Sequence, residues 1–329
     1  MSSKGLKKVL IIKLGAIGDV VHTMIIPAAI KQKHPDYEIH YMTSNFILPM
    51  IENSIYIDKV IGFDDRQKNS LKYLFSVIKD LQKEKYDIIF CLSNTLRLLF
   101  LSTGACPKKI GFRKCCNKSW VEEYFYSAKK IINDIELPDK LTLNCDPKRK
   151  AELQKEFAQY PHPHIVLNPG AYYSSNRAGR TWDIEKWKDL SERILQTYGG
   201  TIFVNGSQYE YKEHIKLEND NVKILSGKYS LADSCIVLSL MDLVISGDSG
   251  PVHIASAYDV KTLALLGSTS PDKIKPYGNN GYFVEPSNNC KYCWKKKCKK
   301  IKEDELYSPC IESISVVSVT EKIKTENLL

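Results

Sequence analysis

Short apolar runs and amphipathic stretches alternate along this chain. In the first half, apolar runs of strand length stand at residues 7–13, 38–42, 59–63, 87–92 and 109–112. In the second half they stand at residues 164–167, 201–205, 222–225, 243–245 and 262–266. Stretches with helical periodicity, such as residues 20–33 and 70–84, lie between them. Buried strands that alternate with helices predict an α/β fold built on parallel, doubly wound sheets.

The alternation is interrupted between residues 146 and 163. A charged helical stretch at 148–159 runs into Tyr-Pro-His-Pro-His, and proline can continue neither a helix nor a central strand. The α/β pattern resumes at Ile165. We therefore predict two Rossmann-like domains, residues 1–160 and 161–329, since the chain is also too long for one typical core. Ligands of open α/β sheets bind at the carboxyl ends of the strands, so we expect a cleft between those edges of the two sheets.

Composition restricts the class of protein. With 43% hydrophobic and 26% charged residues, the chain is typical of soluble globular proteins, and no apolar run approaches the roughly 18 residues of a membrane span. The first residues lead directly into a strand and lack the cleavage site of a signal peptide. We expect a cytoplasmic protein, in which the ten cysteines are thiols or metal ligands rather than disulfides. The net charge of +9 favours anionic partners: nucleotides, phosphorylated glycans, an acidic lipid surface or nucleic acid.

Residues 243–267 form the most informative segment. An apolar run ends at Gly247-Asp-Ser-Gly250, a short helix that contains His253 follows, and a second apolar run comes next. This pattern predicts a βαβ unit with Asp248 and Ser249 at the end of its first strand. The two glycines let the backbone approach a ligand, and the helix directs its free N–H groups and positive dipole end to the same point. Such a loop suits a phosphate group.

Two further strand-end loops of the second half carry matching chemistry. The loop after Asn168-Pro-Gly-Ala contains Arg177 and Arg180, so one or two guanidinium groups stand just before a helix. The next strand ends in Asn205-Gly-Ser-Gln-Tyr and Glu210, a carboxylate near the place where a ribose diol is often held. Arginine for phosphate, an acid for ribose and a helix N-terminus for pyrophosphate together predict a nucleoside-diphosphate site.

The first strand is followed by a glycine loop and a helix. Gly15-x-x-Gly18 lacks the first glycine of a dinucleotide-binding fingerprint, and no Gly-Lys-Ser/Thr follows, so neither that fingerprint nor a P-loop is supported. The loop does place Asp19 at the start of the helix. Two interpretations of Asp19 stay open: a helix N-cap, which aspartate fills well, and a catalytic carboxylate.

A cysteine cluster lies near the end of the chain. Cys290-x-x-Cys293 has the spacing of a metal knuckle, and Cys298 and Cys310 would complete four ligands for a structural zinc or iron. The alternative is a reduced surface loop. Seven lysines and no acid lie between Cys290 and Lys302, which fits either a solvated charged face or a patch for anionic lipid headgroups.

Several motifs together resemble the heptosyltransferase family, glycosyltransferase family nine. They are Ile12-Lys-Leu-Gly-Ala-Ile-Gly-Asp-Val-Val-His-Thr23, Asn168-Pro-Gly-Ala171, Arg180-x-Trp182, and Gly247-Asp-Ser-Gly-Pro-Val-His-Ile-Ala255 followed by Gly267-Ser-Thr269. The resemblance covers nearly the whole chain, with the motifs in the family's order. One departure is Asp183, which takes the place of a proline that often follows the tryptophan.

The resemblance implies a GT-B architecture and an inverting transfer of a heptose from ADP-heptose onto the lipopolysaccharide inner core. Residues 1–160 would bind a lipid-linked phosphorylated acceptor and residues 161–329 the donor, with the last helix a candidate to pack back on the first domain. Asp19 matches the catalytic base, with Gly15, Gly18 and His22 around it on the acceptor side. The residues implied for the donor are Arg180, with Arg177 as the competing arginine, Glu210, Asp248, Ser249, Gly250 and His253. The chemistry would need no divalent metal, and the enzyme would work at the inner face of the cell membrane.

Two other classes of protein remain as alternatives. A sugar-nucleotide epimerase shares the double-Rossmann scheme, but it acts without an acceptor, and the paired motifs around Asp19 and Asp248 argue against it. A non-catalytic, basic nucleotide- or nucleic-acid-binding protein would need aromatic side chains among its lysines, and only Tyr292 and Trp294 qualify. We therefore expect no nucleic-acid partner. The sequence leaves open the exact sugar, the base and the acceptor position.

Overall fold

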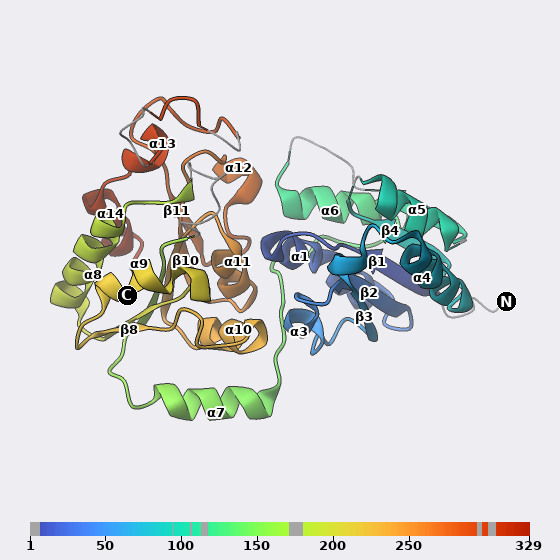
Figure 1. The fold of residues 1–329 in the computed structure, drawn as a ribbon, viewed down its shortest axis with the longest axis horizontal. Helices are drawn as coiled ribbons and strands as arrows, with labels where there is room; N and C mark the ends of the chain where they lie inside the picture. Colours follow the sequence, from blue (N-terminus) through green and yellow to red (C-terminus); the bar gives the residue numbers. More distant parts are fainter. Residues whose placement is uncertain are drawn as a thin grey trace. The chain divides into compact units, whose positions relative to one another are not determined.

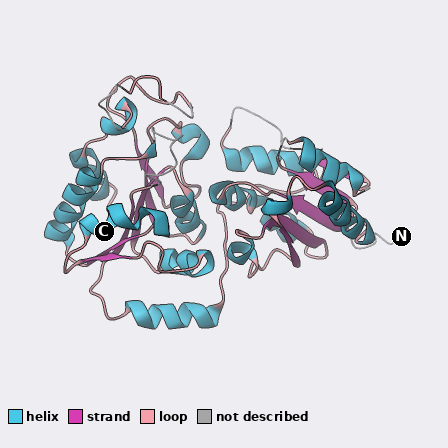
Figure 2. Ribbon diagram, in the orientation of Figure 1, coloured by secondary structure: helices cyan, strands magenta, loops and turns pink. Residues whose placement is uncertain are grey.

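The computed structural model describes residues 7–93, 95–105, 107–112, 118–170, 180–294, 298–301 and 307–329. The chain forms two compact units, Met1–Cys145 and Asp146–Leu329. Each unit contains one sheet with helices packed around it, as Figures 1 and 2 show.

The first unit is built on a five-stranded sheet in which every strand pair is parallel. Its strands are β1 (Lys8–Ile12), β2 (Glu38–Ser44), β3 (Lys59–Phe63), β4 (Ile88–Cys91) and β5 (Lys109–Phe112). Their order is β3-β2-β1-β4-β5, so the chain builds outward from β1 first on one side and then on the other. The loop after β1 therefore lies at the switch point where open α/β sheets bind ligands.

Helices cover the first sheet. On one face, α4 (Leu71–Lys83) and α5 (Leu96–Gly104) pack in one core with Leu10 and Ile12 of β1. The helices α1 (Ile17–Thr23) and α2 (Ile25–Lys33) connect β1 to β2, in the opposite direction across the sheet from the connections that contain α4 and α5. Because such connections are right-handed, α1 and α2 cover the opposite face of the sheet. There α6 (Trp120–Lys129) packs against them. Two short elements, α3 (Leu48–Ile51) and η1 (Asp65–Gln67), complete the unit.

The helix expected at residues 20–33 is two helices. It starts earlier, at Ile17, and divides at Met24 into α1 and α2. Pro27 explains the division: it has no N–H to donate to the carbonyl of Thr23, so the ladder of helical hydrogen bonds is interrupted there. Beside this break, the hydroxyl of Thr23 donates to the carbonyl oxygen of Val20 at 2.7 Å.

The second unit is built on a six-stranded, fully parallel sheet. Its strands are β6 (His164–Asn168), β7 (Thr201–Val204), β8 (Val222–Ile224), β9 (Leu243–Gly247), β10 (Lys261–Leu265) and β11 (Gly281–Val284). The order β11-β10-β9-β6-β7-β8 places the switch point between β6 and β9. The loops that follow these two strands therefore share the ligand-binding edge. The pattern analysis missed β11, a four-residue edge strand in which only Val284 is buried.

Helices surround the second sheet as well (Figure 1). They are α7 (Pro147–Phe157), α8 (Ile184–Tyr198), α9 (Tyr211–His214), α10 (Leu231–Ser239), α11 (Gly250–Ala257), α12 (Pro271–Ile274), α13 (Pro309–Glu312) and α14 (Val316–Thr325), with the single turns η3 (Gln208–Glu210) and η4 (Ile215–Leu217). In the described part of the chain, no helix has both the length and the apolar composition that crossing a bilayer requires.

The charged helix α7 lies in the second unit, since the two units divide before it, at Cys145 and Asp146. The sequence pattern predicts the domain boundary after this helix, at residues 160 and 161. Arg149 of α7 forms a two-pronged ion pair with Asp233 of α10, with N–O distances of 2.8 and 3.1 Å. Such planar pairs orient as well as attract. The sequence showed where the α/β pattern stops, but not which of the two units the intervening helix packs against.

The last helix, which the sequence offered as a candidate to pack back on the first domain, packs on α8 and β11 of its own unit. The buried side chains of α14, Val316, Val319 and Ile323, join one hydrophobic core with Trp187 and Leu190 of α8. These contacts account for the whole apolar stripe of α14, whose other side chains are charged or polar apart from the exposed Val317.

Candidate functional site

A buried lysine and a partly exposed aspartate meet at the end of β1. The Nζ atom of Lys13 lies 2.9 Å from Oδ2 of Asp19, and the two side chains are 7% and 42% exposed. The ring of Tyr124 lies 5.6 Å from the same ammonium group. The loop passes close over this pair, because a Cβ at Gly15 would lie 3.5 Å from Nζ and 3.7 Å from Oδ2. The Lys13 ammonium thus holds a carboxylate at the ligand-binding edge of the sheet.

The structure removes one of the two interpretations of Asp19. The N-cap of α1 is Ala16, and no side chain caps this helix, so Asp19 does not act as the cap. It lies one turn further, in the first turn of α1, next to Gly18. His22, in the last turn of the same helix, is buried, at 2% exposed. The sequence analysis missed Lys13; the only signal was a lysine placed directly after a buried strand.

In the second unit, the predicted phosphate loop lies at the end of β9. Ser249 is the N-cap of α11, which begins at Gly250. The Ser249 hydroxyl lies 2.7 Å from that of Ser246 and accepts a 3.4 Å hydrogen bond from the side-chain amide of Asn168, at the end of β6. The two strands at the switch point are therefore joined by side-chain hydrogen bonds at the N-terminus of an α-helix.

Asp248 is the centre of a charged cluster in this loop. Its side chain is 3% exposed, and its Oδ2 lies 3.1 Å from Nη2 of Arg180. Its Oδ1 lies 3.7 Å from Nε2 of the equally buried His253. Burial favours the neutral acid, but the nearby His253 ring, the Arg180 charge and the Thr269 hydroxyl outweigh it and lower the pKa of Asp248. Asp248 is therefore ionised and orients the guanidinium of Arg180, whose side chain is 26% exposed.

Gly247 has a structural role different from the one that its sequence context suggested. A Cβ at this position would lie 2.6 Å from the carbonyl oxygen of Arg180, closer than real Cβ atoms come to backbone. The glycine thus lets the chain's own backbone at Arg180, and not only a ligand, pass over the end of β9. Arg177, the competing arginine, lies outside the described residues.

Glu210 is nearly buried, at 8% exposed. Its Oε2 accepts hydrogen bonds from the backbone N–H and the hydroxyl of Ser207, at 2.7 and 2.8 Å, as in a capping box. Beside this turn His214, 1% exposed, lies 2.6 Å through Nδ1 from the Ser226 hydroxyl. A Cβ at Gly206 would come within 2.5 Å of the His214 ring. Burial lowers the pKa of His214 to about 4.

The cysteine cluster is not assembled as a ligand set. All seven cysteines in the described residues are free thiols, and within those residues no group of three or more histidines, cysteines or acids is arranged to hold a metal. Cys310 is buried at the start of α13, whereas Cys293 is exposed. Hydrogen bonds of Asn288 nevertheless connect the start of the cysteine segment to α13. The Asn288 side-chain amide donates to the carbonyl of Pro309 at 2.9 Å, and its oxygen accepts from the N–H of Cys290 at 3.0 Å.

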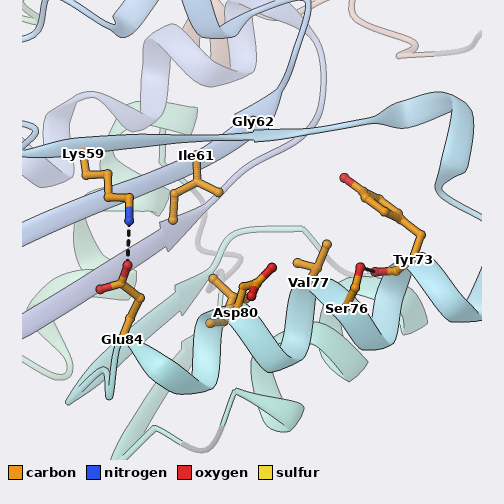
Figure 3. Close-up of a pocket in the computed structure, with 9 residues that line it drawn as sticks. Lys59, Ile61, Gly62, Tyr73, Ser76, Val77, Asp80 and Glu84 are labelled. Carbon is orange, nitrogen blue, oxygen red and sulfur yellow. Dashed lines mark hydrogen bonds and ion pairs between the residues drawn. The ribbon is translucent and has the colours of Figure 1, made fainter.

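A separate cavity of about 260 Å³ lies in the first unit, between β3 and α4. Figure 3 shows the Lys59–Glu84 ion pair at one end and Tyr73 at the other. The two charged atoms of that pair are 2.6 Å apart. None of the predicted site residues lines this cavity.

Comparison with known proteins points to one family. Residues 74–303 match the model of glycosyltransferase family 9 (heptosyltransferase). Lipooligosaccharide heptosyltransferase 2 of Campylobacter jejuni is 30% identical, in an alignment that covers 94% of this chain and 95% of the relative. The lipopolysaccharide core heptosyltransferase OpsX of Haemophilus influenzae is 24% identical, with 93% and 95% covered.

Solved structures share the fold. The glycosyltransferase family 9 protein of Veillonella parvula superposes with a TM-score of 0.83 at 18% identity, covering 97% of this chain and 96% of that one. E. coli heptosyltransferase WaaC with ADP gives 0.72 at 18% identity, covering 97% and 99%. The iron-containing dodecameric glycosyltransferase TibC of E. coli gives 0.60 at 12% identity, covering 98% and 77%. The two parallel α/β sheets therefore have the GT-B fold that the sequence predicted.

Proposed function

The chain belongs to glycosyltransferase family 9, the heptosyltransferases, and from this premise we propose that it transfers a heptose from ADP-heptose onto a lipopolysaccharide core acceptor, with inversion at the anomeric carbon. Its membership of this family makes it a glycosyltransferase and sets aside the epimerase and the nucleic-acid-binding protein. The observation that carries the proposal is this membership together with the Arg180–Asp248 pair beside the N-terminus of α11.

We assign the donor to the second unit. The guanidinium of Arg180 is oriented by a buried carboxylate and partly exposed, which suits it to the diphosphate. The backbone N–H groups at Gly250 and the start of α11 add a positive dipole end near the same point. Glu210 is the acid proposed for the ribose, supported by its place after β7 at the ligand-binding edge. Its bonds from Ser207 fix its orientation.

We assign general-base catalysis to Asp19 in the first unit. Inversion requires one displacement: the acceptor hydroxyl loses its proton to the carboxylate while its oxygen attacks the anomeric carbon, and the bond from that carbon to the diphosphate breaks. Negative charge then develops on the departing ADP, where Arg180 and the α11 amides would stabilise it. Asp19 is suited to the task because it is ion-paired to Lys13 yet 42% exposed.

We also propose an acceptor that is phosphorylated and lipid-linked, and a peripheral location on the inner face of the cell membrane. The net charge of +9 supports both, because phosphates on the acceptor and anionic lipids attract a basic protein. Relatives named for lipopolysaccharide core synthesis support the same acceptor class.

A structural zinc or iron at Cys290, Cys293, Cys298 and Cys310 remains a proposal. Its support is the sequence spacing and the iron in TibC. The reaction scheme does not use this metal.

Product analysis tests the proposed function directly. The purified full chain is incubated with ADP-heptose, UDP-sugars or GDP-sugars and with core acceptors of stepwise truncation, with and without their phosphates, and the products are identified by mass spectrometry. We expect one heptose per acceptor from ADP-heptose alone. Transfer from a UDP- or GDP-sugar instead, or conversion of the sugar nucleotide without an acceptor, would contradict the proposal.

A further inference from the structure

The first unit carries an exposed apolar surface on α4 and α5. Its five side chains are Leu71 (67% exposed), Phe75 (58%), Leu96 (87%), Leu99 (41%) and Phe100 (38%). We call this surface the α4–α5 patch. Large apolar groups this exposed and this close together mark an interaction surface more often than chance.

The patch is continuous across the two helices. Leu71 and Phe75 are four residues apart on α4, and Leu96, Leu99 and Phe100 follow helical spacing on α5, so each set shares one helix face. The rings of Phe75 and Phe100 meet edge-to-face with centroids 5.5 Å apart. Figure 1 also shows α4 and α5 as neighbours on the first sheet.

Basic side chains surround the patch. Residues 64–84 and 96–104 contain six lysines and arginines against four acids. Asp64 pairs with Arg66 at 3.1 Å, and Glu84 pairs with Lys8 and Lys59 of the sheet. One of these acids, Asp80, already pairs with Lys83 at 2.7 Å. Lys68, Lys72 and Lys79 are exposed. Arg97 donates to the uncharged side chain of Asn69, so it keeps its net charge.

The patch begins at the edge of the sheet where Asp19 lies. α4 follows β3 and α5 follows β4, so in this parallel sheet both helices start at the carboxyl ends of the strands. Leu71 and Leu96, the first residues of the two helices, therefore lie at the same edge as the loop after β1. A surface that held a lipid here would present the attached sugar toward that edge.

We propose that the α4–α5 patch docks this enzyme on an anionic membrane, with its leucines and phenylalanines in the headgroup region and its lysines on lipid phosphates. The inference rests on the proposed function, because a lipid-linked acceptor gives the enzyme a reason to reach the bilayer. Charge selects this occupant: a second copy of the chain would set cations against cations, whereas acidic lipids complement both the apolar and the basic part.

Vesicle binding by the full chain tests the proposal. The protein is floated with phosphatidylcholine vesicles with and without phosphatidylglycerol, at low and high salt. We expect binding to the anionic vesicles, weakened by salt. Phe75→Ser combined with Leu96→Ser should lower the affinity about tenfold or more, because it removes two inserted side chains. Lys72→Ser should lower it about fivefold.

Matched controls separate this surface from general effects. Ile55→Ser removes an equally exposed apolar side chain (69% exposed) of the same unit outside the two helices, and Lys188→Ser removes an exposed lysine of α8. Both should bind vesicles like the unchanged protein. Equal losses in the controls, undiminished binding by the double variant, or a dimer in sedimentation that the double variant abolishes would each overturn the proposal.

Turnover with two forms of the acceptor separates this inference from the proposed function. On a deacylated, water-soluble acceptor, the double variant should match the unchanged protein in kcat/KM. On the same acceptor embedded in anionic vesicles it should fall behind by the factor lost in binding. If the unchanged protein transfers no heptose to either acceptor but still binds vesicles through the patch, the proposed function fails while the docking surface stands.

Discussion

Lys13 Nζ and Asp19 Oδ2 lie 2.9 Å apart, and the lysine is the more buried of the two, at 7% against 42% exposed. A buried ammonium needs a counter-charge, and this carboxylate supplies it. The pair thus holds the Asp19 carboxylate beside the glycine loop while 42% of the side chain stays exposed. Such an arrangement suits a base that must meet an incoming hydroxyl in one orientation.

Asp19→Asn should lower turnover by roughly 10² to 10⁴, the usual worth of general-base assistance. The amide keeps the shape and still accepts a hydrogen bond from Lys13, but the buried ammonium loses its counter-charge, so we expect a stability loss of about 2 to 3 kcal/mol for this partly exposed pair. ADP affinity, measured by titration calorimetry, should be unchanged. Asp80→Asn, on an exposed aspartate of the same unit, is the control. Normal turnover by folded Asp19→Asn protein would mean that another group is the base.

Lys13→Met should lower kcat about tenfold with little change in ADP affinity, because Asp19 loses the contact that orients it. The decisive measurement is the double variant: in the Asp19→Asn background, Lys13→Met should cause no further loss, since coupled residues are not additive. Lys8→Met, at the other end of β1, is the matched control. Equal losses in both backgrounds would show that Lys13 acts independently of Asp19.

Most strands followed from the sequence because buried parallel strands are continuous apolar runs, such as Val9–Ile12, which is fully buried. The elements that the sequence did not predict depend on contacts between distant residues or on a single backbone atom. β11 is an edge strand of four residues in which only Val284 is buried, so its apolar run is short. The boundary between the first two helices depended on the missing N–H of Pro27. The packing of α7 on the second unit depended on the Arg149–Asp233 ion pair, whose residues are 84 positions apart in the sequence.

The candidate site divides in the same way. The strand-end loops predicted Asp19, Asp248 and Ser249, because a polar residue next to a glycine after a buried strand is visible locally. Lys13 was missed because its burial depends on the loop passing over it. Nor does the sequence show that Gly247 is needed for the backbone of Arg180, which lies 67 positions earlier; only the folded loop brings these two residues together.

Arg180→Ala should weaken ADP binding by about 1.5 to 3 kcal/mol, the range for hydrogen bonds to charged groups. It should also destabilise the protein, because Asp248 is left buried with one cation fewer. Adding Asp248→Asn should recover stability but not ADP affinity, and this split distinguishes a phosphate ligand from a structural ion pair.

Arg193→Ala, on an exposed arginine of α8, is the control for the loss of a positive charge. Arg177→Ala decides between the two arginines of the loop. If Arg180→Ala leaves ADP affinity unchanged and Arg177→Ala abolishes it, the donor-phosphate role belongs to Arg177.

The cysteine proposal predicts about one zinc or iron per chain in protein purified with and without oxygen, by elemental analysis. Cys293→Ser should lose the metal, and chelation should lower the melting temperature before it lowers turnover. Cys145→Ser, outside the cluster, should keep the metal. Metal-free protein with an unchanged melting temperature and full activity would leave the cysteines as a reduced surface loop.

His214 makes the stability of the second unit depend on pH. Burial lowers the pKa of His214 from its ordinary 6.5 to about 4, so the unfolded chain takes up a proton between these values while the folded chain does not. Stability from the neutral ring is therefore complete above pH 6.5 and is lost as the pH falls toward 4, by up to about 3 kcal/mol.

Urea unfolding at several pH values, for the unchanged protein and His214→Gln, isolates this contribution. Glutamine does not titrate, so the variant should be less stable at pH 7 yet lose less stability on acidification. Parallel pH profiles for the two proteins would show that His214 does not exchange its proton on unfolding, and that acid sensitivity arises elsewhere.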